Sequence, residues 1–206
     1  MLEADPHIIR TAATGDHRAF EIIVRTYQEP VVRFLAHLLS DRVLADDVAQ
    51  ETFLRCYQKL DHYSFEGRFS TWLLRVAHNA GIDAIRSRVR RERLDGAGTI
   101  VSATDPVLRA ELVAALGTLP VRLREPLLLV EVTGLRYREA AEVLGIPEGT
   151  VKSRVAHARS RLARWFRAGD ESRPGAGERS GRNDVEAPYR DERGRDDGKG
   201  ASGAVS

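Results

Sequence analysis

Four acidic side chains between positions 41 and 51 come nearest in this sequence to a catalytic or metal-binding group. Asp47 and Glu51 stand one helical turn apart, a spacing at which two carboxylates can share a cation, and Asp41 and Asp46 are their neighbours. No Glu-x-x-His pair accompanies them, and the six histidines are scattered along the chain. No Gly-x-Gly-x-x-Gly or Walker-type run offers a nucleotide-binding loop. The pattern disfavours an enzyme, and we expect no catalytic residue, metal or cofactor.

The stretch from Arg136 to Arg167 is strongly basic. It holds eight basic and three acidic residues, a net charge of +5 in a chain whose formal net charge is +2. Basic charge gathered in this way favours a polyanionic partner, because binding releases the counterions condensed on that partner. For any single residue of the stretch, a merely solvated charged face is the alternative interpretation.

The same stretch has the pattern of a helix-turn-helix. Ala140, Ala141 and Leu144 would face inward on a short helix, and Gly145 permits a tight turn after it. Pro147 then opens a second helix. The positions that would form the buried seam of this second helix are Val151, Val155, Ala158 and Leu162.

The opposite face of the second helix suits the major groove of DNA. Lys152 can donate to guanine edges, and the flanking arginines suit phosphate contacts. An amphipathic hairpin that packs on another element is the alternative, which the small inner residues and the basic charge disfavour. We predict DNA contacts from Lys152, Ser153, Arg154, Ala156, His157 and Arg161.

The segment Asp46–Leu60 reads as an amphipathic helix with one misplaced apolar residue. Its core-facing stripe covers about half the circumference. Leu54 falls instead in the middle of the polar side, where an apolar side chain ringed by polar ones is typical of a protein-docking surface. A lone exposed leucine is the alternative. The predicted docking residues are Asp47, Gln50, Glu51, Leu54 and Gln58.

The segment from His62 to Arg91 combines aromatic and basic residues. His62–Ser70 reads as a loop that contains Phe65, Arg68 and Phe69, and a helix with a basic far end follows. Such a surface suits single-stranded or opened DNA, whose bases can flip and stack on aromatic rings. The alternative is that Phe65, Phe69 and Trp72 are core residues and that the arginines are solvated. For Trp72, which begins an apolar stripe, we favour the core interpretation.

Composition predicts a cytoplasmic protein without membrane insertion. No apolar run approaches the roughly 20 residues needed to span a bilayer, and the start of the chain lacks the basic-then-apolar order of a signal peptide. The single Cys56 lies on the apolar stripe of the 46–60 helix, so we expect a buried structural thiol.

Helical periodicity predicts an all-α chain of two small domains joined by a flexible linker, with a disordered C-terminal tail. Asp16 and Ser70 are expected helix caps, and Asp105-Pro106 an expected helix start. Pro30 should break or kink the first long helix. The predicted boundaries are 5–92 for the first domain, 93–105 for the linker, 106–168 for the second domain and 169–206 for the tail.

Three stretches together resemble the extracytoplasmic-function (ECF) group of sigma-70-family transcription initiation factors. They are DDVAQETFLRCYQKL, FEGRFSTWLLRVAHNAGIDAIRSRVRR and GLRYREAAEVLGIPEGTVKSRVAHARSRL, in the order and spacing of the family. The resemblance covers roughly residues 15 to 166. It implies a sigma2-like domain, a flexible linker and a sigma4-like helix-turn-helix domain. The tail lies outside it.

The resemblance also implies roles for the predicted surfaces. The Asp46–Leu60 helix would dock on the beta-prime clamp helices of core RNA polymerase, whose beta subunit is a further expected contact, and the Glu148–Arg164 helix would read the −35 element. The linker would thread toward the RNA exit path, and an anti-sigma protein is a plausible partner. The opened −10 element would be held by Phe65, Glu66, Arg68, Phe69, Asn79, Asp83 and Arg86.

The main alternative is a stand-alone helix-turn-helix regulator. Such a protein normally dimerises on a two-fold operator. It would leave the Asp46–Leu60 surface and the His62–Arg91 segment unexplained. We therefore expect a promoter-specificity subunit of RNA polymerase that acts by binding, with polymerase supplying the catalysis.

Overall fold

Aspartate side chains cap the N-termini of the first three helices. The carboxylate of Asp5 accepts from the backbone N–H of His7 at 2.8 Å, and that of Asp16 accepts from Ala19 at 2.9 Å. Asp41 caps the third helix by accepting from a backbone N–H three residues further on. Each bond satisfies an amide that has no partner inside its own helix. The prediction that Asp16 caps a helix is confirmed.

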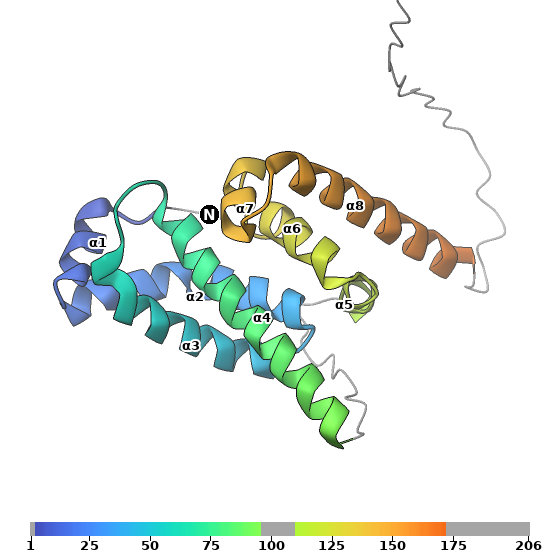
Figure 1. Cartoon of the computed structure of the whole chain (residues 1–206), viewed down its shortest axis with the longest axis horizontal. Coiled ribbons are helices and arrows are strands. Elements are labelled where there is room, and N and C mark those ends of the chain that lie inside the picture. The colour runs from blue at the N-terminus through green and yellow to red at the C-terminus, as the bar shows by residue number, and fades with distance from the viewer. Residues whose placement is uncertain (1–2, 96–109, 172–206) are drawn as a thin grey trace, which may run out of the picture. The chain divides into compact units, whose positions relative to one another are not determined.

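A computed structural model describes residues 3–95 and 110–171, and within these ranges the chain is helical and holds no strand (Figure 1). The all-α prediction is confirmed. Most of the predicted linker and tail, and the predicted helix start at Asp105-Pro106, lie outside the described residues. The elements are α1 (Pro6–Ala13), α2 (His17–Leu39), α3 (Arg42–Lys59), the 3-10 turn η1 (Leu60–His62), α4 (Phe69–Asp95), α5 (Ala110–Gly117), α6 (Val121–Glu131), α7 (Tyr137–Leu144) and α8 (Glu148–Glu171).

Helix α2 runs through Pro30 without a break. A proline inside a helix removes one hydrogen bond and costs about 3 kcal/mol. Tyr27, Val31 and Phe34 lie on both sides of Pro30 and are completely buried. Burial of each such side chain contributes about 1.5–3 kcal/mol, which offsets the proline and keeps the helix continuous.

Helices α2, α3 and α4 pack against one another, and α1 packs on α2. The apolar stripe predicted for the 46–60 helix faces this core. Cys56 is fully buried within it, and burial raises the pKa of its thiol to about 12. The thiol is therefore structural, as the sequence predicts, because almost none of it is ionised near neutral pH.

Helices α6, α7 and α8 form a second packed group, with α5 against α8. Gly145 ends α7 in the left-handed conformation at φ 64°, a value that glycine adopts without steric penalty. Val151, Val155 and Ala158 of α8 are buried against α6 and α7. The predicted helix-turn-helix is therefore present, with its seam at these positions.

Arg124 of α6 joins the second group of helices to the first. Its side chain is almost fully buried and reaches the C-terminal end of α2, where Nη1 donates to the carbonyl of Leu38 at 2.9 Å. Nη2 donates at 3.0 Å to the carbonyls of Gly117 and Leu119, at the end of α5. One guanidinium thus satisfies carbonyl groups at two helix ends that have no partner within their helices.

Candidate functional site

An apolar groove lies between α2 and α3. It encloses about 790 Å³. Leu54 stands at its α3 side with 64% of its surface exposed. The lining residues are His17, Phe20, Val24, Gln28, Val32, Asp46, Ala49, Gln50, Phe53, Leu54 and Tyr57.

All five predicted docking residues are exposed on α3, but the groove gathers only two of them, Gln50 and Leu54. Glu51 forms an ion pair at 2.6 Å with Arg55, which also reaches Asp83 of α4 at 3.4 Å. A residue predicted to face polymerase and one predicted to face DNA are therefore linked through a single guanidinium.

Sequence reasoning missed the α2 wall of the groove. Four lining residues recur every four positions along α2, and each directly follows a buried residue that faces the core. They are Phe20, Val24, Gln28 and Val32. Two adjacent stripes with helical spacing mark a helix that has apolar contacts on more than one side. This repeat was the signal that could have revealed the groove.

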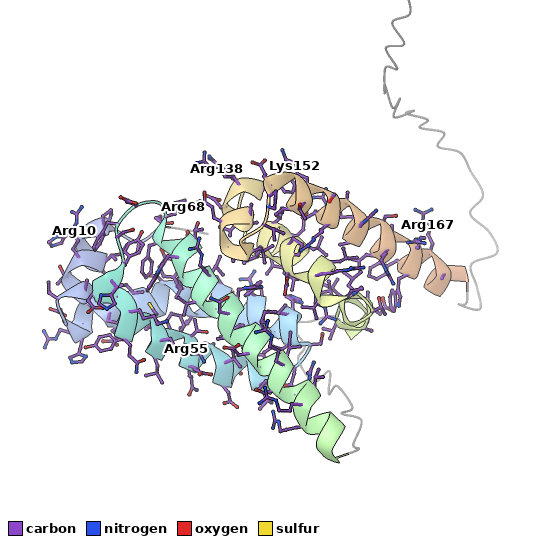
Figure 2. All side chains as sticks on the ribbon, viewed as in Figure 1. Arg10, Arg55, Arg68, Arg138, Lys152 and Arg167 are labelled. Carbon is purple, nitrogen blue, oxygen red and sulfur yellow. The ribbon has the colours of Figure 1, made fainter. Side chains whose placement is uncertain are left out.

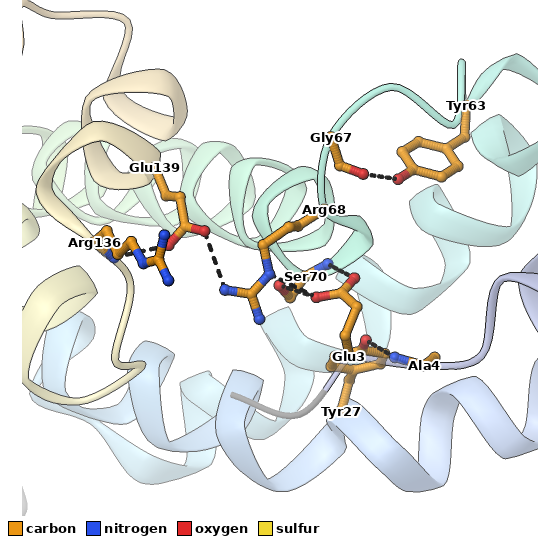
Figure 3. A network of polar contacts seen from close by, with 9 residues as sticks. All are labelled: Glu3, Ala4, Tyr27, Tyr63, Gly67, Arg68, Ser70, Arg136 and Glu139. Atoms are coloured by element: carbon orange, nitrogen blue, oxygen red, sulfur yellow. Dashed lines mark hydrogen bonds and ion pairs between the residues drawn. The ribbon is translucent and has the colours of Figure 1, made fainter.

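The loop between η1 and α4 is built around aromatic rings. Tyr63 is buried, and its ring lies 4.9 Å from that of Phe65 and 5.3 Å from that of Trp72. The hydroxyl of Tyr63 donates to the carbonyl of Gly67 at 3.1 Å, which closes the loop (Figure 3). Phe65 has φ 57°, which is rare for a bulky residue and is found where the surrounding structure enforces it.

The aromatic residues of this segment divide into core and surface. Phe69 is only 1% exposed, so the core interpretation holds for it, and its predicted contact with DNA is corrected. Its ring packs 5.5 Å from those of Tyr27 and Trp72. Phe65 is 39% exposed and remains available, with the Arg10 guanidinium 5.5 Å from its ring centroid.

Arg68 is held between two carboxylates from distant parts of the chain. Its Nε lies 3.1 Å from Glu3, and its Nη1 lies 3.0 Å from Glu139 of α7 (Figure 3). Burial alone would raise the pKa of the Glu139 carboxyl, but the backbone N–H of Arg136 and the Arg68 guanidinium together hold that pKa below its ordinary value. Arg75 makes a second contact with α7, donating to the carbonyl of Glu142 at 2.8 Å.

The other residues predicted to hold opened DNA lie on the surface of one helix or in the loop before it. Asn79, Asp83 and Arg86 are exposed and follow one another at helical spacing on α4, and Glu66 is exposed in the loop. Arg86 lies 3.9 Å from Asp83. The structure brings Asn79, Asp83 and Arg86 to one side of α4.

The outer face of α8 carries the residues predicted to contact duplex DNA. Five of the six, Arg154 being half-buried, are exposed. Lys152 pairs with Glu148 at 2.8 Å, and the hydroxyl of Ser153 donates to the carbonyl of Thr150. Figure 2 shows Lys152 on α8 close to α7, with Arg167 toward the other end of the same helix. The pair with Glu148 is exposed and therefore weak, so a base or phosphate can replace it.

The acidic residues near position 46 are engaged in local structure. Asp41 caps α3, and Asp46 pairs with Arg42 at 3.3 Å. Across residues 3–95 and 110–171, no three histidine, cysteine or acidic side chains gather in a way that could hold a metal ion. No helix in these ranges is long and apolar enough to cross a membrane.

Comparison with known proteins identifies both helical groups. Residues 23–91 match the family described as sigma-70 region 2, and residues 109–162 match sigma-70 region 4. The chain is 39% identical over 170 residues to the ECF RNA polymerase sigma factor SigC of Mycobacterium tuberculosis, covering 78% of this chain and 90% of that protein. It is 34% identical to SigW of Bacillus subtilis, covering 77% and 95%.

A solved structure shows the same fold. The sigma factor RpoE of Bartonella quintana, in complex with the anti-sigma factor NepR, superposes with a TM-score of 0.64 at 27% sequence identity. The match covers 72% of this chain and 96% of that one.

Proposed function

The chain belongs to the ECF group of the sigma-70 family and is an alternative sigma factor, and we propose which of its surfaces meet core RNA polymerase and the two promoter elements. Members of this family are transcription initiation factors rather than enzymes. They bind core polymerase and direct it to promoters. We assign no catalytic step to this chain, and we place it in the cytoplasm with polymerase and the chromosome.

The groove between α2 and α3 is the proposed docking site for the beta-prime clamp helices. The observation that carries this proposal is the exposure of Leu54, 64%, beside an apolar groove of about 790 Å³. A helix laid against a groove typically anchors itself through a few apolar side chains that polar residues surround. Gln50, Glu51 and Asp47 supply such a polar border.

The loop before α4 is the proposed site for the opened −10 strand. Phe65 offers an exposed ring on which a flipped base can stack. The exposed face of α4 with Asn79 and Arg86 continues from this loop and can follow the strand. Phe69 contributes indirectly, because its buried ring supports the loop.

The outer face of α8 is the proposed reader of the −35 duplex. Lys152 and His157 are exposed opposite the buried seam, as expected for a recognition helix in a major groove. Arg161 lies further along the same helix and suits a phosphate. We also propose regulation by an anti-sigma protein, since the Bartonella relative was solved with one.

Run-off transcription with core polymerase and a library of promoter-like DNA tests this proposal. Leu54→Ala should weaken binding to core polymerase about thirtyfold, the equivalent of about 2 kcal/mol for one buried apolar anchor. Val43→Ala is the matched control, because Val43 is 75% exposed on the same helix and does not line the groove. Lys152→Ala should change the preferred upstream sequence and leave core binding unchanged.

Two results would count against the assignment of surfaces. Equal core binding by the Leu54 and Val43 variants would remove the groove from the docking site. No transcript, together with a dimer of the protein alone shifting a duplex operator, would favour a stand-alone regulator.

A further inference from the structure

Glu3 contacts the proposed −10 loop although it lies outside the matched family regions, which begin at residue 23. Its carboxylate accepts from the backbone N–H of Ser70 at 3.0 Å and from the hydroxyl of the same serine at 2.7 Å. The other partner of this carboxylate is Arg68, whose Nε donates to it at 3.1 Å (Figure 3).

The contact with Ser70 is a helix cap supplied by a distant residue. Helix α4 begins at Phe69, so the N–H of Ser70 has no acceptor within the helix. A negative charge at the N-terminus of a helix also interacts favourably with the positive end of the helix dipole. Ser70 itself was the expected cap, but it lies within the helix and donates to Glu3 instead. Glu3 thereby fixes the point where the loop ends and the helix begins.

The contact with Arg68 orients a cation of the loop. Glu3 binds the Nε side of the guanidinium, while Nη1 points to Glu139. Arginine has several rotatable bonds, and holding it in one geometry costs side-chain entropy that a fixed partner offsets. With Glu3 in place, the guanidinium is presented in one orientation before DNA arrives.

The N-terminal segment is itself firmly held. The backbone N–H of Ala4 donates to the hydroxyl of Tyr27 at 2.8 Å, and burial raises the pKa of that phenol to about 12, so the hydroxyl stays neutral. Asp5 then caps α1. A second contact from this segment reaches the loop, because Arg10 of α1 lies over the ring of Phe65.

We infer that Glu3 is a positioning residue for capture of the −10 strand, which rests on the proposed function of the loop. It holds Arg68 and the start of α4 so that Phe65 and its neighbours meet the opened strand in one geometry. The same carboxylate repels phosphates. Glu3 therefore lowers affinity for any strand while raising preference for the right one, and this combination distinguishes positioning from plain structural support.

The test measures a ratio of affinities. Full-length protein bound to core polymerase is titrated with two fluorescent single-stranded oligonucleotides, one carrying the −10 sequence selected by transcription and one with that sequence scrambled. Partial unfolding scales both apparent affinities equally, so their ratio reports selectivity alone. The variants are Glu3→Ala, Glu3→Gln and the control Asp5→Ala, which removes a helix cap of the same segment without touching the loop.

Glu3→Ala should reduce the ratio about tenfold, as expected for losing one hydrogen bond to a charged group, while affinity for the scrambled strand stays equal or rises. The ratio for Glu3→Gln should lie between those of wild type and Glu3→Ala, because the amide oxygen of glutamine can still accept from Ser70. Asp5→Ala should keep the wild-type ratio. A wild-type ratio for Glu3→Ala overturns the inference, as does an equal loss for Asp5→Ala. If wild-type protein itself does not discriminate between the strands, the proposed −10 site fails, and the role of Glu3 with it.

Discussion

Replacing Arg124 by methionine should weaken the attachment of the second group of helices to the first. The guanidinium is 7% exposed, and its bonds go to oxygen atoms at helix ends rather than to a carboxylate. Burial, with a smaller effect of nearby Arg88, lowers the pKa of Arg124. The four acceptors are the carbonyls of Leu38, Gly117 and Leu119 and the hydroxyl of Ser40.

The expected loss follows from these bonds. A hydrogen bond that involves a charged group contributes about 1.5 kcal/mol, so four such bonds contribute about 6 kcal/mol. Burying the charge costs several kcal/mol, which methionine no longer incurs. The net loss from Arg124→Met should therefore be about 3 kcal/mol. This loss in stability weakens the packing of α5 and α6 against the C-terminal end of α2.

The two tryptophans report on the two groups separately, because Trp72 lies in α4 and Trp165 in α8. Urea unfolding is followed by fluorescence in a Trp165→Phe background and in a Trp72→Phe background. With a slope of about 2 kcal/mol per molar urea, the loss corresponds to about 1.5 M. The Trp165 midpoint should fall by that amount in Arg124→Met, and the Trp72 midpoint by clearly less.

Arg122→Met is the control, since Arg122 is exposed on the same helix. It should move both midpoints by no more than about 0.25 M, the equivalent of about 0.5 kcal/mol. The reasoning is refuted if Arg124→Met behaves like this control, or if it lowers both midpoints equally.

The remaining predictions concern stability. Gly81→Ala should cost about 1–2 kcal/mol in thermal unfolding, because a Cβ there would lie 2.8 Å from the buried Cδ2 of Leu38. Gly149→Ala, with nothing within 4 Å, should instead stabilise by up to about 1 kcal/mol, and equal effects would contradict this account. The lowered pKa of Glu139 means that its stabilisation is complete above its unfolded pKa of about 4.3 and disappears as pH falls through the folded value. Glu139→Gln and wild type should therefore differ in unfolding free energy at pH 6 and converge only as pH falls below the lowered folded pKa of Glu139, and a constant difference would exclude this role.

Periodicity within a single helix predicted which of its residues are buried and which are exposed. The seam of α8, the exposed position of Leu54 and the burial of Cys56 follow from spacing within a single helix, and the structure confirms them. Periodicity does not say which helices become neighbours. The repeat at Phe20 and Val24 indicated a second apolar stripe on α2, but only the packing of α3 beside α2 makes that stripe one wall of a groove.

Contacts between distant residues account for the other misses. Glu3 reaches Ser70 across 67 positions, and no spacing rule connects an acidic residue near the start of a chain to a helix that begins so much later. The unbroken course of α2 through Pro30 also depends on distant contacts. The local cost of the proline can be predicted from sequence, but the burial that offsets this cost depends on helices α3 and α4, which pack on α2 only in the folded chain.

The ion pair between Arg68 and Glu139 bears on how one chain can contact two separated promoter elements. The two promoter elements are separated by about 25 base pairs, or about 85 Å of duplex. Arg68 belongs to the proposed reader of one element and lies 3.0 Å from α7, which leads directly into the proposed reader of the other. Helix α8 is only about 36 Å long. Under the proposed assignment of the two readers, contact with both elements at once requires this ion pair to break, whereas contact with either element alone leaves it in place.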